Sequence, residues 1–225
     1  MIKYLTIYTT AELICLIAAV VCLYNAKALH WRLLIPFMLI TCLVEIGALP
    51  LKAVYRANPI PSNSSAWMYN LLLLLQMGAF TVMFYNFIGK YLVGKFLIVT
   101  GITILLLLYI YEIYTNAFGI FNYNSRTYSV MSVLFVIYSL SYYYALLKNE
   151  EYAELKFLPD FWWATGTLFF FFGTTALNMF RSKLVIQPLK NTLYLGYLDT
   201  TLIVILYGCW TYAFICKRWI TSNKK

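Results

Sequence analysis

Seven stretches of predominantly apolar residues, each about as long as a membrane-crossing helix, occupy most of this 225-residue chain. A transmembrane helix needs about 20 such residues to cover the hydrocarbon layer. Only 11% of the residues are charged, whereas soluble domains carry roughly 25%. A core this small still needs a polar shell in water, so the bilayer must be the solvent for most of this surface. The segments cover residues 4–24, 33–54, 67–88, 95–114, 127–147, 161–181 and 193–216.

These segments predict an all-α fold, a polytopic membrane protein with one transmembrane domain over residues 1–225, built as a bundle of seven helices. The connections are short, and the clearest, residues 56–66 (RANPIPSNSSA), is rich in Pro, Ser and Asn. None can house a soluble domain, so any activity must lie in the bundle or in partners. We expect the first segment to be a retained helix rather than a cleaved signal peptide, because its apolar run is long and contains Glu12.

The basic residues indicate an orientation. Ten of the 17 Lys and Arg residues fall on the side of the bundle that holds the C-terminus, and basic connections favour the cytoplasm. We therefore expect an N-out, C-in protein in the cell inner membrane. The formal net charge of +9 comes from residues at helix ends. These residues suit contacts with membrane lipids, and no basic cluster is dense enough to indicate nucleic acid.

Polar side chains that interrupt the apolar segments give the best indication of function. A carboxylate or amide in hydrocarbon is costly and normally faces a protein interior or a wet cavity. At about 1.5 Å per residue, all six acids and amides among the candidates fall in the outer half of the predicted bundle. This shared depth predicts a polar pocket that opens outward. The candidate ligand-binding residues are Glu12, Glu45, Asn70, Gln76, Asn178, Arg181 and Asp199.

Nearby residues suggest how such a pocket would be built. Lys52 or Arg181 is the expected counter-ion for one of the carboxylates. Pro50 is predicted to kink the second segment, because proline cannot donate a backbone hydrogen bond inside a helix. Gly196 precedes Asp199 by about one turn, which predicts the close approach of a neighbouring helix or a ligand there.

Isolated polar residues in membrane helices have a second, structural use. They bond neighbouring helices together, at roughly 0.6 kcal/mol each. The amides Asn70, Gln76 and Asn178 fit that use. The carboxylates are more costly to bury, which favours a functional reading for them.

Several classes of protein are excluded. No Lys lies between Asn191 and Cys216, so the seventh segment cannot carry a retinal Schiff base. A single His, His30, with no CxxC or HxxE pattern argues against a zinc or iron site. No P-loop, HExxH or GxSxG motif occurs. The Cys count is odd, and every Cys falls within or at the end of an apolar segment, so no disulfide framework is expected. We expect no cofactor, no metal and no catalytic residue set.

Three stretches carry a resemblance: LVEIGALP (residues 43–50), WMYNLLLLLQMGAFTVMFYNFI (residues 67–88) and FLPDFWWATGTLFFFFG (residues 157–173). They resemble a group of small, mostly uncharacterised multi-pass proteins of Bacteroidota-type bacteria. The resemblance implies a Glu in the second helix, which Glu45 supplies, and often a Glu in the third, where Gln76 stands here. It also implies a membrane component encoded near histidine kinases.

We therefore expect a membrane sensory, binding or signalling-partner protein that is not an enzyme. A small molecule, lipid or partner helix would occupy the outer pocket, and a membrane or cytoplasmic partner would receive the signal. A small-solute or proton-coupled transporter is the alternative, with Glu45 and Asp199 exchanging protons. A membrane enzyme acting on lipid ranks last, because the chain offers no nucleophile–base pair or metal set.

Overall fold

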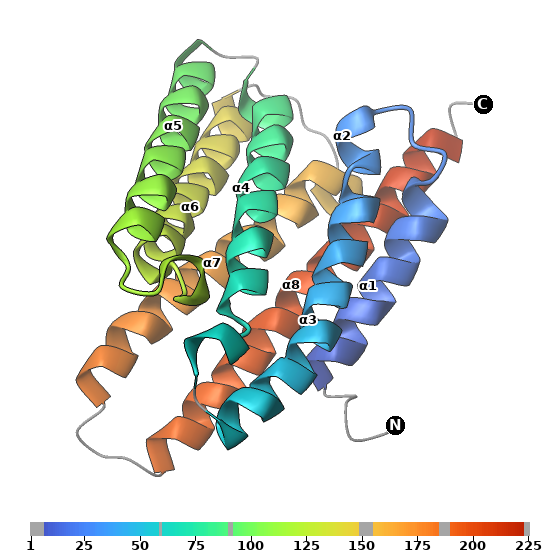
Figure 1. Ribbon diagram of the computed structural model, residues 1–225. Helices are drawn as coiled ribbons and strands as arrows, with labels where there is room; N and C mark the ends of the chain where they lie inside the picture. The colour runs from blue at the N-terminus through green and yellow to red at the C-terminus, as the bar shows by residue number, and fades with distance from the viewer. Residues whose placement is uncertain (1–6, 59, 90–91, 149–154, 185–189, 223–225) are drawn as a thin grey trace.

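The computed structural model describes residues 7–58, 60–89, 92–148, 155–184 and 190–222. In those ranges the fold is all-α and contains no β-strand (Figure 1), which confirms the predicted fold class. The long helices are α1 (Ile7–Leu23), α3 (Leu34–Ala57), α4 (Ala66–Ile88), α5 (Leu92–Thr115), α6 (Ser125–Lys148), α7 (Pro159–Leu184) and α8 (Lys190–Ser222). Shorter elements are α2 (Leu29–Arg32) and the 3-10 turns η2 (Pro61–Asn63), η3 (Gly119–Phe121) and η4 (Leu155–Phe157).

Five of the described helical stretches are long and apolar enough to cross a membrane, so the chain is a multi-pass membrane protein. The described part of α1 is equally apolar but has only 17 residues. The helix α7 is not among the five, because Pro, Asp, Gly and Thr residues interrupt its apolar run. The five stretches are Leu29–Ala57, Ala66–Ile88, Gly94–Thr115, Ser125–Lys148 and Gly196–Ile220.

The long helices pack as neighbours around the bundle (Figure 1). The helix α8 packs most extensively, against α7 on one side and α1 on the other. Contacts then run from α1 to α3, α4, α5, α6 and back to α7, and α4 also contacts α6. The beginning of α1 and the end of α8 lie at opposite ends of the bundle (Figure 1).

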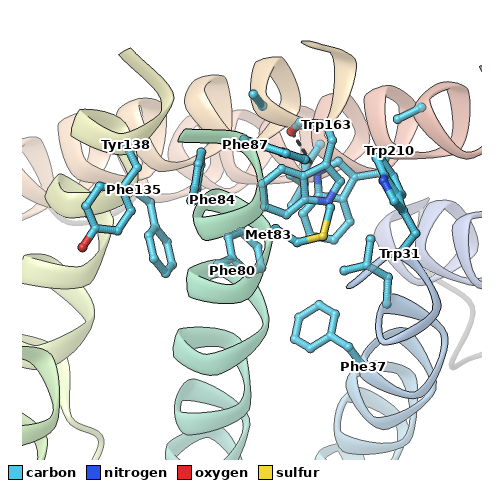
Figure 2. Close-up of a cluster of buried hydrophobic side chains, with 14 of the residues drawn as sticks. Trp31, Phe37, Phe80, Met83, Phe84, Phe87, Phe135, Tyr138, Trp163 and Trp210 are labelled. Carbon is cyan, nitrogen blue, oxygen red and sulfur yellow. Dashed lines mark hydrogen bonds between the residues drawn. The ribbon is translucent and has the colours of Figure 1, made fainter. Parts of the chain in front are cut away.

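The core is dominated by aromatic rings (Figure 2). Trp163 of α7 and Trp210 of α8 stack with their planes 8° apart and their centroids 5.5 Å apart. The indole N–H of Trp210 donates to the Trp163 carbonyl at 3.3 Å and to the Thr167 hydroxyl at 3.4 Å. Phe80 of α4 stacks on Phe135 of α6 at 5.0 Å. These contacts join α7 to α8 and α4 to α6. Aromatic pairs of this kind stabilise the core beyond the energy of simple burial.

Glycines on α7 allow the closest helix approach. A Cβ at Gly166 would lie 2.8 Å from the Cys209 Cβ, and one at Gly173 would lie 2.6 Å from the Leu202 methyl carbons. Small residues let membrane helices approach closely, so these positions set the α7–α8 contact. At Gly196, in contrast, an added Cβ would meet no atom of the described residues within 4 Å. The predicted close approach of a neighbouring helix at Gly196 is therefore not found among the described residues, and the approach of a ligand there stays a prediction.

Candidate functional site

A cavity of about 250 Å³ lies between helices α1, α3, α4, α6, α7 and α8 and the connection between α5 and α6. Most of its lining is apolar, but hydroxyl, carboxyl and amide groups reach it from several helices. A concave, mainly apolar site with a few converging polar groups is the usual form of a small-molecule site. Its polar lining residues are Tyr8, Glu12, Thr41, Glu45, Tyr69, Gln76, Tyr123, Tyr128 and Tyr207.

Three sequence-predicted residues meet at this cavity: Glu12 from α1, Glu45 from α3 and Gln76 from α4. The two carboxyl groups are close enough to interact electrostatically. Three separate helices therefore carry costly polar groups to one place in the bundle. Their role in binding a ligand stays a prediction.

Glu45 belongs to a short hydrogen-bonded chain at one side of the cavity. The Tyr69 hydroxyl donates to Glu45 Oε2 at 3.0 Å, and Lys52 Nζ donates to the Tyr69 hydroxyl at 2.6 Å. Glu45 and Lys52 are seven residues apart on α3, which puts them on one face of the helix. Lys52 also lies 4.8 Å from the centroid of the Tyr69 ring. Of the two predicted counter-ions, Lys52 thus acts on Glu45 through Tyr69.

Glu12 is held in a more enclosed position. Its side chain is 2% exposed, and Oε1 has no hydrogen-bond partner among the described residues. Tyr207 and Cys42 are its polar neighbours. The buried positions of α1 recur at helical spacing from Glu12 through Cys15 to Ala19, so the face that packs on α3 and α8 carries the carboxyl inward.

Aromatic rings form the floor of the cavity. Phe37, Phe170, Tyr207 and Trp210 line it. The Trp210 ring lies 6.4 Å from Phe37 and 6.0 Å from Tyr207 between centroids. Phe37 and Trp210 also belong to the buried core, in which Trp163 stacks on Trp210 (Figure 2). In the described part of the chain, the cavity therefore ends against packed rings.

Asn70 has a structural role instead of a place on the cavity. Its amide nitrogen donates to the carbonyls of Ile120 at 2.9 Å and Asn122 at 2.7 Å, and its oxygen accepts from the Asn124 N–H at 3.0 Å. Asn70 is 1% exposed. These three bonds fasten the connection between α5 and α6 to the start of α4.

The remaining predicted residues lie away from the cavity lining. Asp199 is half-buried on α8 and does not line the cavity. Asn178 is exposed on α7, and the Arg181 side chain lies outside the part that the structure describes. The α8 residues that do line the cavity begin at Ile203, one turn beyond Asp199. The structure thus brings Glu45 and Glu12 to the same cavity, and Asp199 is not among the lining residues.

The sequence reading missed a buried carboxylate, Glu112, near the end of α5. It is 4% exposed and accepts hydrogen bonds from the Arg126 N–H at 3.0 Å, the Thr127 N–H at 2.8 Å and the Thr127 hydroxyl at 2.7 Å. These N–H groups belong to the first turn of α6, which lacks intrahelical partners for them. Glu112 therefore caps α6 from a neighbouring helix.

The sequence reading also missed polar partners of the cavity acids. A helical-spacing signal could have found them, because residues four or seven apart share a face. The pairs at such spacing that line the cavity are Tyr8 with Glu12, Thr41 with Glu45, and Tyr69 with Gln76.

No protein-family model matches this chain, and no curated protein or solved structure is significantly similar to it. Among the described residues, no group of three or more His, Cys, Asp and Glu side chains is placed to hold a metal ion. The chemistry available at the cavity is that of carboxyl, amide and phenol groups beside aromatic rings.

Proposed function

We propose that this protein is a membrane-embedded binding module of the sensory or signalling kind, whose ligand occupies the cavity at Glu12 and Glu45. The main observation that supports this proposal is that Glu12, Glu45 and Gln76, from three helices, line one cavity of about 250 Å³. Each of these groups is costly to keep within a membrane bundle. A binding site explains why all three are directed at one place, whereas bonding between helices would not require a shared cavity.

The proposed topology is seven crossings of a bacterial inner membrane, N-out and C-in. The start of α1 and the end of α8 lie at opposite ends of the bundle (Figure 1), as an odd number of crossings requires. Lys217 and Arg218 near the end of α8 favour a cytoplasmic C-terminus. Glu12 lies near the start of α1, so the cavity would belong to the outer half of the bundle.

A continuous series of ring contacts supports signalling from the cavity toward the cytoplasmic end. Trp210 stacks on Trp163, Phe87 lies 5.6 Å from Trp163, and Trp31 lies 6.4 Å from Phe87 between centroids. Lys217 then lies 5.2 Å from the Trp31 ring. Packed side chains of this kind are a physical route by which ligand occupancy at Trp210 would bias the cytoplasmic end, where a partner protein would respond.

A proton-coupled carrier is the second candidate, favoured by the adjacency of Glu12 and Glu45. The aromatic floor opposes it, because a carrier needs a polar path to the other side. Flux of protons into proteoliposomes separates the two functions. Ligand-driven flux that Glu45→Gln abolishes would favour the carrier, and binding without flux would favour the sensory module.

The direct experiment is a ligand screen on protein in lipid nanodiscs, using thermal unfolding as the readout. Glu12→Gln and Glu45→Gln preserve side-chain size while removing charge. Asp160→Asn, in the first turn of α7 and outside the cavity lining, is the matched control. A ligand that stabilises the wild type and the control, but neither cavity variant, supports the proposal. Equal stabilisation of all four proteins would remove the cavity as the site.

A further inference from the structure

We infer that the cavity binds a small organic cation, with an ammonium group held between Glu12 and Glu45 and an apolar body against the aromatic floor. This inference rests on the binding function proposed above and names its ligand class. Four properties of the cavity support it: an unpaired hydrogen-bond acceptor, the charge of the lining residues, the aromatic rings and the volume.

One unpaired carboxylate oxygen favours a ligand that donates a hydrogen bond. Glu12 lines the cavity beside Tyr207 and Cys42, and its buried Oε1 accepts no hydrogen bond from the described residues. The Tyr69 proton is already given to Glu45, and the Thr41 hydroxyl donates to the Phe37 carbonyl at 2.9 Å. A buried acceptor without a donor is costly, and an ammonium N–H is the group that satisfies a carboxylate.

Charge favours a cation over a neutral donor. A bound cation would stabilise the ionised form of both carboxyl groups, and the described lining residues would then carry two negative charges and no positive charge. Lys52 lies next to this set, at 2.6 Å from the Tyr69 hydroxyl, and balances one of them. One negative charge is left for a ligand that carries a single positive charge. Within a membrane bundle such a charge pair is strengthened by the low dielectric.

The ring content explains why an organic cation fits better than an inorganic one. Phe37, Tyr207 and Trp210 belong to the aromatic floor of the cavity. Aromatic rings attract ammonium groups through their negative faces and also pack against hydrocarbon. A sodium or potassium ion, in contrast, needs several oxygen ligands and gains little from the aromatic floor.

Size restricts the ligand further. A cavity of about 250 Å³ is several times the roughly 30 Å³ that one water takes in the liquid. It is slightly smaller than the roughly 300–1,000 Å³ of sites for drug-sized ligands. An amine with one ring or a short chain therefore matches it.

Three probes of nearly equal shape test the inference: benzylammonium, benzyl alcohol and benzoate. Their affinities for the wild-type protein in nanodiscs would be measured by isothermal titration calorimetry, with sodium chloride held constant. We expect benzylammonium to bind at least about tenfold more tightly than benzyl alcohol, and benzoate to bind most weakly. Glu12→Gln should reduce benzylammonium affinity by about tenfold and leave benzyl alcohol nearly unchanged.

The outcomes separate this inference from the proposed function. If benzoate or benzyl alcohol binds best, and Glu45→Gln alters that binding, the cavity is a binding site but the cation assignment is overturned. A specific effect is a change in probe binding that Glu12→Gln or Glu45→Gln causes and Asp160→Asn does not. If no probe shows a specific effect, both the cation assignment and the proposed site are overturned. Size-exclusion profiles of the variants would verify that each one folds, and Glu45→Gln serves if Glu12→Gln does not.

Discussion

The Tyr69 hydroxyl donates a 3.0 Å hydrogen bond to Glu45 Oε2 and so joins α4 to α3 at the edge of the cavity. The same hydroxyl accepts from Lys52 Nζ, so one phenol connects a cation beside the cavity to a cavity acid. The arrangement fixes the carboxylate of Glu45 toward α4 and gives Lys52 a place beside the site without entering it.

Replacing Tyr69 by Phe removes this connection while keeping the ring. Glu45 then loses a donor and Lys52 loses an acceptor, so we expect stability to fall by about 1–2 kcal/mol. Thermal unfolding in nanodiscs measures the change. Tyr114→Phe is the control, because Tyr114 is 90% exposed. Equal melting temperatures for the two variants would show that the Tyr69 bonds contribute little.

Replacing Gln76 by Glu adds a third acid to the cavity. If the ligand is a cation, the added charge should raise its affinity by about threefold to tenfold, because opposite charges attract strongly in a low-dielectric site. Titration of benzylammonium into the two proteins measures this gain. Gln76→Met has similar length without charge and should give no gain. Weaker binding to Gln76→Glu than to the wild type would contradict a cationic ligand.

Glu112 should be important for stability and not for binding. Glu112→Ala leaves the Arg126 and Thr127 N–H groups without their acceptor, which should cost about 2–4 kcal/mol. Thr127→Val removes only the hydroxyl bond and should cost about 1 kcal/mol. Chemical unfolding in mixed micelles compares the two. The account is wrong on this point if both variants unfold like the wild type.

Asn70 should control the connection between α5 and α6. Asn70→Asp keeps the oxygen that accepts from Asn124 but loses both bonds donated to Ile120 and Asn122. We expect faster amide hydrogen exchange over residues 116–124, since exchange reports local opening. Exchange over α8 should stay unchanged. Unaltered exchange in the connection would show that it is held by other contacts.

Long apolar runs made the helices predictable from the sequence. The described helices follow the seven predicted segments closely, although α8 continues to Ser222, beyond the predicted end at residue 216. Residues 4–6 of the first predicted segment lie outside the described part. Such runs specify helices strongly, because a backbone in lipid must satisfy its hydrogen bonds internally. The seven crossings and their orientation stay a proposal.

The cavity was predictable only in part. The cost of burying acids pointed to Glu12 and Glu45, and both line one recess. Depth along a helix can be counted from the sequence, but the direction that a side chain faces depends on how its helix is rotated against its neighbours. For α8 that rotation depends on contacts such as those at Gly166 and Gly173, and it leaves Asp199 out of the cavity lining.

Glu112 illustrates another limit. Its partners are backbone N–H groups of Arg126 and Thr127, fourteen and fifteen residues further along the chain. Backbone groups carry no sequence signal of their own. A carboxylate near the end of an apolar segment is also easily read as the point where the helix leaves the membrane.

A double-mutant cycle on benzylammonium binding tests the central claim most directly, because it asks whether Glu12 and Glu45 hold one ligand together. Affinities of the wild type, Glu12→Gln, Glu45→Gln and the double variant would be measured by calorimetry in nanodiscs. Residues that share a ligand should be coupled by more than about 0.5 kcal/mol. We predict such coupling: Glu45→Gln should change the binding free energy by a different amount in the Glu12→Gln protein than in the wild type. Strict additivity, or no effect of either substitution, would contradict a shared site.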